Sequence, residues 1–207
     1  MFSCWRRKNT KVSDFEIIDG PIESKNIKSN NIIFGQDFNY PIINLPGSTE
    51  SIVIENRYFN QSIDNLPIGL KLLVLNGRYN QPLDYLPYGL EILKFKSSSI
   101  FSHRLDYLPA TLKLIEIPLL YNHDIDSLPD SIEEIRIGVK TMLNDETIYY
   151  PEYYDSESIV FNKKINKIPE KLKKLFIFGD YEHLKEIQQK YGNIVIPIYR
   201  DTHTYKN

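Results

Sequence analysis

The residues best suited to chemistry are carboxylates that recur about 20 residues apart along the chain. Asp64, Asp84, Asp106 and Asp126, with Asn166 in the same slot, each stand three residues before a proline. Stacked carboxylates can bind calcium or act as an acid and a base. Their spacing matches neither a calcium-binding repeat nor an EF-hand loop. We therefore expect a capping role, in which each side chain accepts hydrogen bonds from backbone N–H groups of a tight turn.

A second candidate is a pair of histidines in equivalent positions of adjacent repeats. These are His103 and His123, and Asp124 follows the second of them. Two imidazoles and a carboxylate can hold a metal ion. His183 and His203 lie outside this position, however, and neither an HExxH motif nor a cysteine pair accompanies them. We interpret both histidines as surface residues and expect no metal or other cofactor.

Motifs of catalysis are missing from the sequence. The chain has no phosphate-binding loop, nucleophile elbow or zinc motif, and no set of Ser, His and Asp outside the repeating structural positions. We therefore expect a protein that is not an enzyme, and an unrecognised catalyst is the less favoured alternative.

Composition limits the class of protein and its partners. The 207 residues suit one domain, and 25 Lys and Arg against 27 Asp and Glu favour neither nucleic acid nor an anionic membrane. Cys4 is the one cysteine, which indicates a reducing, cytoplasmic compartment; a free thiol is a simpler reading of it than an acylation site. The start of the chain turns basic at once, and no run resembles a signal peptide or a membrane span.

The elements that position all these residues are internal repeats. Prolines after an apolar or aromatic residue recur at steps of 21, 20, 22, 20, 22 and 18 residues, at positions 46, 67, 87, 109, 129, 151 and 169. Full copies begin at Phe38, Phe59, Tyr79, Phe101, Tyr121 and Phe161. A degenerate copy is expected between Leu143 and Val160. About seven turns of roughly 21 residues follow, as in a solenoid.

Each copy predicts one short strand. Apolar residues two apart form two columns, of which one contains Ile52, Leu73, Leu93, Ile115, Ile135 and Leu175. Because the strands run the same way, they pair in parallel, and the rest of each copy leads the chain back to the start of the next strand.

Charged residues just before the strands alternate in sign, which favours pairing between parallel neighbours: Glu50, Lys71, Glu91, Lys113, Glu133 and Lys173. Asparagines after the opening aromatic, such as Asn60 and Asn80, predict a ladder of hydrogen bonds between turns. The fold class is therefore an α/β repeat solenoid.

Several of these copies carry a phrase that resembles the FNIP repeat family. The phrase is read at Phe38-Asn39-Tyr40-Pro41-Ile42, Phe59-Asn60-Gln61-Ser62-Ile63, Tyr79-Asn80-Gln81-Pro82-Leu83 and Phe161-Asn162-Lys163-Lys164-Ile165. The resemblance implies a variety of leucine-rich repeat, used chiefly for protein recognition and found in social amoebae and in giant DNA viruses. Some members place an F-box before the repeats and serve as substrate adaptors of ubiquitin ligases. Here about 30 residues precede the repeats, without evident F-box helices.

Three regions are expected along the chain. Residues 1–31 form a partly flexible N-terminal segment, residues 32–179 the solenoid and residues 180–207 a C-terminal cap. In the cap, Asp180 is expected to begin a helix over 181–191 that Gly192 ends, and Ile194, Ile196 and Ile198 predict a strand.

Function is expected on two surfaces. The outward strand positions Val53, Leu72, Val74, Ile92 and Leu114 predict an exposed apolar patch on the sheet face, with Lys94 and Glu116 beside it. Residues 1–31 or a second copy of the chain are alternative covers for that face. Tyrosines offer a second surface on the return side, at Tyr85, Tyr88 and Tyr107, and a further cluster at Tyr149, Tyr150, Tyr153 and Tyr154.

The sequence thus predicts a scaffold that presents its sheet face to a protein partner whose identity, like the oligomeric state, is open. The alternative is a ubiquitin-ligase adaptor that recruits the ligase through its N-terminal segment.

Overall fold

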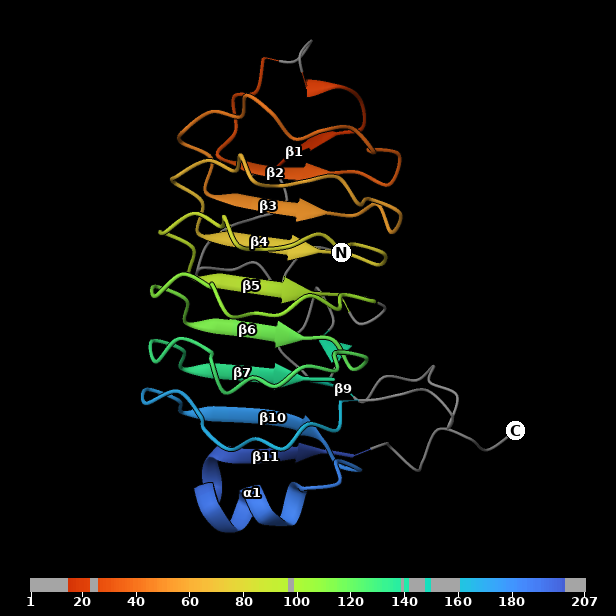
Figure 1. Ribbon diagram of the computed structural model, residues 1–207. Helices are drawn as coiled ribbons and strands as arrows, with labels where there is room; N and C mark the ends of the chain where they lie inside the picture. The colour runs from red at the N-terminus through yellow and green to blue at the C-terminus, as the bar shows by residue number, and fades with distance from the viewer. Residues whose placement is uncertain are drawn as a thin grey trace, which may run out of the picture.

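The protein is described from a computed structural model, which covers residues 15–22, 26–96, 99–138, 140–141, 148–149 and 161–199. Its main element is a nine-stranded sheet whose strands follow one another in chain order (Figure 1). The strands are β1 (Phe15–Ile18), β2 (Asn31–Phe34), β3 (Ser51–Ile54), β4 (Leu72–Leu75), β5 (Ile92–Phe95), β6 (Leu114–Ile117), β7 (Glu134–Ile137), β10 (Lys174–Phe178) and β11 (Val195–Ile198).

Every neighbouring pair in this sheet is parallel, and like positions of the repeat lie side by side. Leu73 pairs with Ile52 on one side and with Leu93 on the other, and Leu93 pairs with Ile115. The predicted charge alternation is also present, since Lys113 Nζ lies 2.9 Å from Glu91 Oε2. The leucine-rich-repeat-like parallel solenoid is therefore confirmed.

The recurrent prolines open a tight turn on the return side of each coil. Where the structure describes these prolines, the proline carbonyl accepts a hydrogen bond from the N–H three positions on, as from Leu70 to Pro67, from Leu90 to Pro87 and from Leu112 to Pro109, all at 3.0 Å. A proline fits this place because its carbonyl is used and its missing N–H is not. The turn then directs the chain into the next strand.

The interior is one continuous apolar cluster that runs the length of the sheet. Inward strand residues such as Leu73 and Ile115 are fully buried in it. The opening aromatics stack between turns, with ring centroids 6.2 Å apart for Phe59 and Tyr79 and again for Phe101 and Tyr121. Each coil therefore buries its apolar side against its neighbours, which is how a solenoid is stabilised.

The prediction that a degenerate copy between Leu143 and Val160 forms a turn of the solenoid is wrong. Strand β7 pairs directly with β10, and Lys173 Nζ lies 2.7 Å from Glu133 Oε2 across that junction. The chain between them includes the short antiparallel pair β8 (Lys140–Thr141) and β9 (Ile148–Tyr149), which forms a separate sheet. In sequence, residues 143–160 lack a Leu-Pro pair. The solenoid has a further coil at each end, from β1 to β2 and from β10 to β11. Together the strands make about 8 turns.

A helix and a final strand close the C-terminal end, as predicted. Helix α1 (Leu184–Tyr191) buries Leu184 and Ile187 in the main cluster, and a 3-10 turn over Gly192–Ile194 leads into β11. Gly192 has φ +64° and ends the helix, a conformation that glycine adopts readily. The predicted start is wrong, because the N-cap residue is His183 and not Asp180. Among the described residues, no helix has the length and apolar character needed to cross a membrane.

Candidate interaction surfaces

The outward apolar positions of the sheet are not exposed, contrary to the prediction. Val53 is 0% exposed, Val74 2% and Leu72 8%, while Ile92 and Leu114 are half-buried. Val53, Leu72 and Val74 form a second apolar cluster with Ile33, separate from the solenoid interior, and Ile92 packs against it. Alternation along the strands identified the outward side correctly but could not show that this side is covered. A buried face of this kind is common in parallel sheets.

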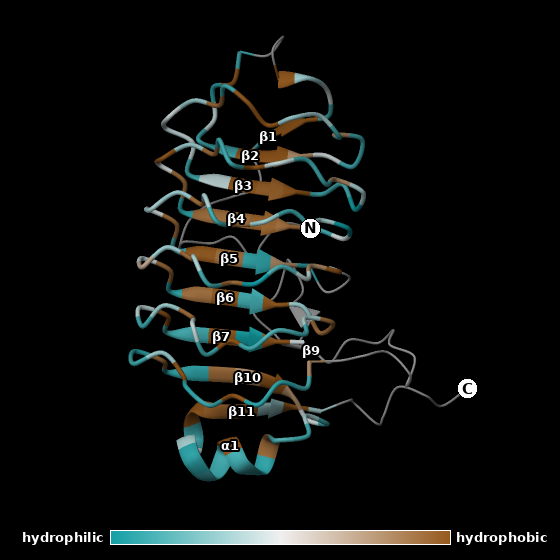
Figure 2. Ribbon diagram, viewed as in Figure 1, coloured by the Kyte–Doolittle hydropathy of each residue, from teal (hydrophilic) through white to brown (hydrophobic). Residues whose placement is uncertain are grey.

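Beyond this cluster the outward strand positions become charged, with Lys94 on β5, Glu116 on β6 and Arg136 on β7, and Figure 2 shows hydrophilic stretches in these strands. Lys94 Nζ lies 3.1 Å from Glu116 Oε1, and Arg136 Nη1 lies 2.8 Å from the same oxygen. Arg136 also pairs with Glu134 at 2.5 Å. Burial opposes the charge of Arg136, but Glu116 and Glu134 more than offset it and raise the pKa of the guanidinium. The predicted Lys94 and Glu116 are thus brought together and paired with each other, and at 8% and 6% exposure they are not a free surface either.

The return-side tyrosines, in contrast, are open to solvent. Tyr88 is 84% exposed, and Tyr85 and Tyr107 are each 73% exposed. Sequence reasoning missed a fourth member, Ile68, which is 77% exposed and follows Pro67 as Tyr88 follows Pro87. The shared position in the repeat is the signal that would have found it. We call Ile68, Tyr85, Tyr88 and Tyr107 the return-side strip.

Tight stacking of the coils holds this strip together. Thr111 Oγ1 donates to Leu90 O at 2.9 Å and also to Tyr88 O, which joins two successive turns. A Cβ added at Gly89 would lie 3.3 Å from Ile68 O, so the neighbouring turns are in close contact there. Equivalent positions of stacked parallel strands are about 4.8 Å apart. The four side chains come from turns in three consecutive coils of the stack.

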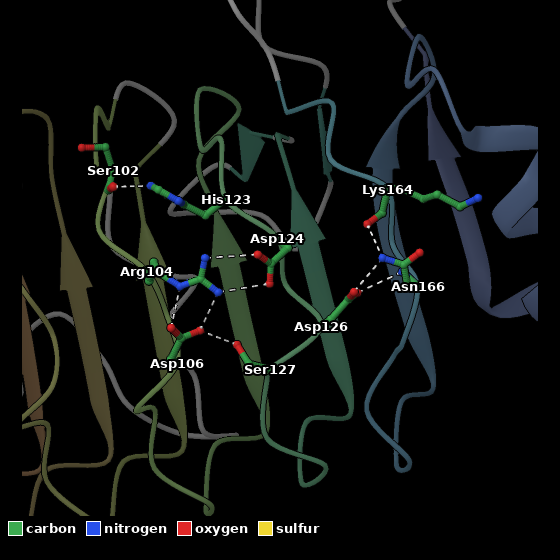
Figure 3. A network of polar contacts seen from close by, with 9 residues as sticks. All are labelled: Ser102, Arg104, Asp106, His123, Asp124, Asp126, Ser127, Lys164 and Asn166. Carbon is green, nitrogen blue, oxygen red and sulfur yellow. Dashed lines mark hydrogen bonds and ion pairs between the residues drawn. The ribbon is translucent and has the colours of Figure 1, made fainter.

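In the Asp column, the carboxylates of Asp106 and Asp126 bond to protein groups of their own and adjacent turns (Figure 3). Arg104 Nε lies 2.6 Å from Asp106 Oδ2, and Arg104 Nη1 lies 3.2 Å from Asp124 Oδ2. Ser127 Oγ donates to Asp106 at 2.7 Å. The bonds from Arg104 and then Ser127 hold the pKa of Asp106 below its ordinary value.

Asp126 shows where the capping prediction was wrong. Its carboxylate accepts bonds from the backbone N–H of Asn166 at 2.9 Å and of Lys167 at 3.1 Å, in the coil stacked beside it and not in its own turn. Burial works against ionisation of Asp126, but the bonds from Asn166 and the two N–H groups outweigh it and lower the pKa. Asp126, and Asp106 through Ser127, therefore link neighbouring coils.

The histidines also link coils. Nε2 of His103 lies 3.1 Å from Asn80 O, and Nε2 of His123 lies 2.7 Å from Ser102 O. Asn80 Oδ1 in turn accepts the N–H of Ser102 at 2.8 Å, which confirms the predicted ladder between turns. Within the part of the chain that the structure describes, no group of three His, Cys, Asp or Glu side chains could hold a metal ion. These residues therefore serve the stacking of the solenoid.

Some predicted positions fall outside the described residues. They are Cys4 and the tyrosines Tyr150, Tyr153 and Tyr154, while Tyr149 is described only as part of the backbone of β9.

Comparison with known proteins agrees with this description. Residues 59–98 match the family model of the FNIP Repeat. The solved structure of CroV588, a giant-virus protein described as a novel circular LRR protein, matches with a TM-score of 0.52 at 23% sequence identity. The match covers 73% of this chain and 24% of that one, so the chain spans about a quarter of that protein's length, and the likeness shows the fold alone. No curated protein matches the chain.

Proposed function

Because residues 59–98 are FNIP repeats on a leucine-rich-repeat-like solenoid, we propose that the chain is a non-enzymatic scaffold that binds a protein partner through its return-side strip. One observation carries this proposal. Ile68, Tyr85, Tyr88 and Tyr107 keep more than two thirds of their surface exposed, on turns whose other large apolar side chains are mostly buried.

The chemistry of the strip favours a protein partner. Tyrosine contributes a large, rigid apolar surface with one hydroxyl, and it is enriched among the residues that dominate binding energy. The strip lies on coils whose backbone is fixed by stacking, so binding would cost little ordering of the scaffold. The sheet face, which the sequence favoured, offers less: its apolar and charged side chains already have neighbours.

The test compares partner capture by matched variants in cells that express the protein. Changing Tyr85, Tyr88 and Tyr107 together to Ser should leave the far-ultraviolet circular dichroism unchanged, since all three are exposed. Proteins that copurify with the wild type should bind at least about tenfold more weakly, because tyrosine anchors each contribute on the order of 1 kcal/mol or more.

A second variant controls for surface change in general. Glu170→Ser with Lys171→Ser alters exposed residues next to Pro169, at the equivalent place of a distant turn, and should capture the same proteins as the wild type. Equal capture by all three forms would show that another surface binds, and the strip would then lose its role.

A further inference from the structure

The arginines in the part of the chain that the structure describes are of two kinds. Arg104 and Arg136 each form ion pairs with two carboxylates. Arg57 and Arg78 are both exposed, and neither forms an ion pair with a described residue. Arg57 and Arg78 therefore keep charges that the rest of the fold does not use.

Both of these guanidinium groups lie against one aromatic ring instead. Arg57 Cζ is 5.1 Å from the centroid of the Tyr58 ring, and Arg78 Cζ is 5.2 Å from the same centroid. The two charges are thus at most roughly 10 Å apart, about one Debye length in moderate salt, so both act on a common ligand. A cation–π contact requires none of the N–H donors of a guanidinium, which stay available for hydrogen bonds.

The backbone that carries these three side chains is fixed by the stacking of the coils. Asn56, which is buried, donates from Nδ2 to a carbonyl of the preceding coil at 2.9 Å and accepts the N–H of Tyr58 at 2.7 Å. The N–H of Arg78 donates to Arg57 O at 2.7 Å. Gly77, with φ +48°, packs so closely that an added Cβ would lie 2.3 Å from that oxygen. The surface is therefore preorganised, which lowers the entropic cost of binding.

The acids on the neighbouring loops do not neutralise the two arginines. In the loops that follow β2 to β5, these acids are Asp37 and Glu55. Glu55 Oε2 lies 2.5 Å from Lys96 Nζ, so its charge is already paired. Asp37 forms no ion pair within the described ranges. Two positive charges therefore stand together on a chain whose net charge is −2.

We propose that Arg57, Tyr58 and Arg78 bind an acidic segment of a protein, whose carboxylates accept hydrogen bonds from the two guanidiniums. Arginine suits carboxylates because its N–H donors bind them in pairs. All three side chains are exposed, Tyr58 by 55%, and an open surface suits a peptide better than a small molecule, which binds in a concave pocket. Nucleic acid is disfavoured, because two arginines neutralise few phosphates and the chain as a whole is negative.

This surface is separate from the return-side strip. Arg57 and Arg78 follow the ends of β3 and β4, on the side to which the strand arrows point in Figure 1, whereas Tyr88 lies in the turn that precedes β5. Binding of a partner through the strip neither requires nor prevents binding here. The two proposals can therefore fail separately.

Fluorescence anisotropy of a labelled peptide of alternating Glu and Gly tests the surface in the full chain. Arg57→Gln with Arg78→Gln should leave the circular dichroism unchanged, because both residues are exposed, and should weaken peptide binding at least about tenfold, because charge-assisted hydrogen bonds are lost. Tyr58→Leu keeps both charges but removes the ring that orders them, and should weaken binding several-fold. Wild-type binding no tighter than that of the double arginine variant would overturn the proposal.

A matched control removes the same amount of charge elsewhere. Lys171→Gln with Lys174→Gln changes two exposed lysines that also lack ion pairs among the described residues, and the peptide should bind this variant as it binds the wild type. An equal loss in this control would reveal a general effect of net charge and refute the proposal, as would tighter binding of a DNA oligonucleotide than of the peptide.

A last variant separates this surface from the strip. Changing Tyr85, Tyr88 and Tyr107 together to Ser should leave the affinity for the acidic peptide unchanged. A loss of affinity as large as that of the arginine variant would place the peptide on the strip and contradict the role of Arg57 and Arg78.

Discussion

At the level of single residues, the aromatic residues that open the coils show how one buried hydroxyl changes the stability of the fold. Tyr79 and Tyr181 stand in the same column, in which Phe38, Phe59 and Phe161 carry no hydroxyl. Tyr181 Oη donates to Lys163 O at 2.7 Å, whereas Tyr79 Oη is buried without a hydrogen-bond partner among the described residues. A buried donor without a partner costs free energy that a phenyl ring avoids.

We therefore expect opposite effects of the same substitution at these two sites. Tyr79→Phe should raise the free energy of unfolding by about 1 kcal/mol, because it removes an unsatisfied hydroxyl. Tyr181→Phe should lower it by about 1 kcal/mol, because it removes a made hydrogen bond and leaves Lys163 O without that donor. Urea unfolding followed by circular dichroism measures both values, and a loss of stability in Tyr79→Phe would contradict this account.

The same pair of variants should differ at alkaline pH. Burial, and then the charge of Asp64, raise the pKa of Tyr79 well above its ordinary value. The folded chain therefore keeps this proton at a pH where the unfolded chain, with a pKa of about 10, has lost it. Stability should fall as the pH rises past about 10, and the fall should be shallower in Tyr79→Phe. Identical slopes in the two proteins would show that the hydroxyl does not titrate with folding.

At the level of elements, strand positions and register could be predicted because local pattern determines them. The alternation of Ile52 and Ile54 or of Leu73 and Leu75 assigns the inward side, and the charges of Lys71, Glu91 and their equivalents assign neighbours. The start of α1 could not be predicted from Asp180, since the helix begins after a non-helical turn at Glu182 and His183. A single candidate capping residue therefore predicts the start of a helix less well than apolar positions that recur in every copy predict the strands.

The interrupted coil allows a direct test of which residues the stack needs. Gly138 and Phe161 border the extra stretch, and Phe161 N donates to Leu119 O of the preceding coil. In an uninterrupted coil only three residues separate Ile117 from Tyr121. Replacing residues 139–160 by two residues would give the same spacing between Ile137 and Phe161.

We expect this shortened chain to keep its fold and to gain up to about 1 kcal/mol of stability, since closing a shorter loop costs less entropy. The direct β7 to β10 pairing supplies the structural reason. Urea unfolding should remain a single transition with nearly the same dependence on urea. Separate transitions for the parts before and after the junction would mean that the extra stretch holds them together.

At the level of the whole molecule, the sequence indicates which residues share a side but not what lies over that side. The outward positions of Val53 and Val74 were read correctly from alternation, yet their burial depends on packing in the third dimension. The exposure of Tyr85, Tyr88 and Tyr107 agreed with expectation, because they lie in turns, which are on the surface. Surfaces made by turns are therefore more predictable here than the face of the sheet.

The two ends of the sheet raise a further question, since an open parallel sheet offers unpaired edges to other chains. At β1, Glu16 takes an inward strand position beside Ile32, and its Oε2 accepts the N–H of Lys28 at 2.9 Å. At β11, Ile198 O accepts from Gly179 at 2.7 Å, so the preceding residue, Pro197, faces the open edge. A proline has no N–H to offer a further strand.

We therefore expect the wild-type chain to be a monomer whose ends do not pair, unlike a solenoid that closes into a circle. Changing Glu16 and Pro197 together to Val restores an apolar inward position and an edge N–H, which should promote end-to-end association by strand pairing. Light scattering should then show concentration-dependent growth for this variant, and none for the wild type or for the control Lys171→Val on the return side. Growth of the wild type itself would mean that Glu16 and Pro197 do not protect the ends.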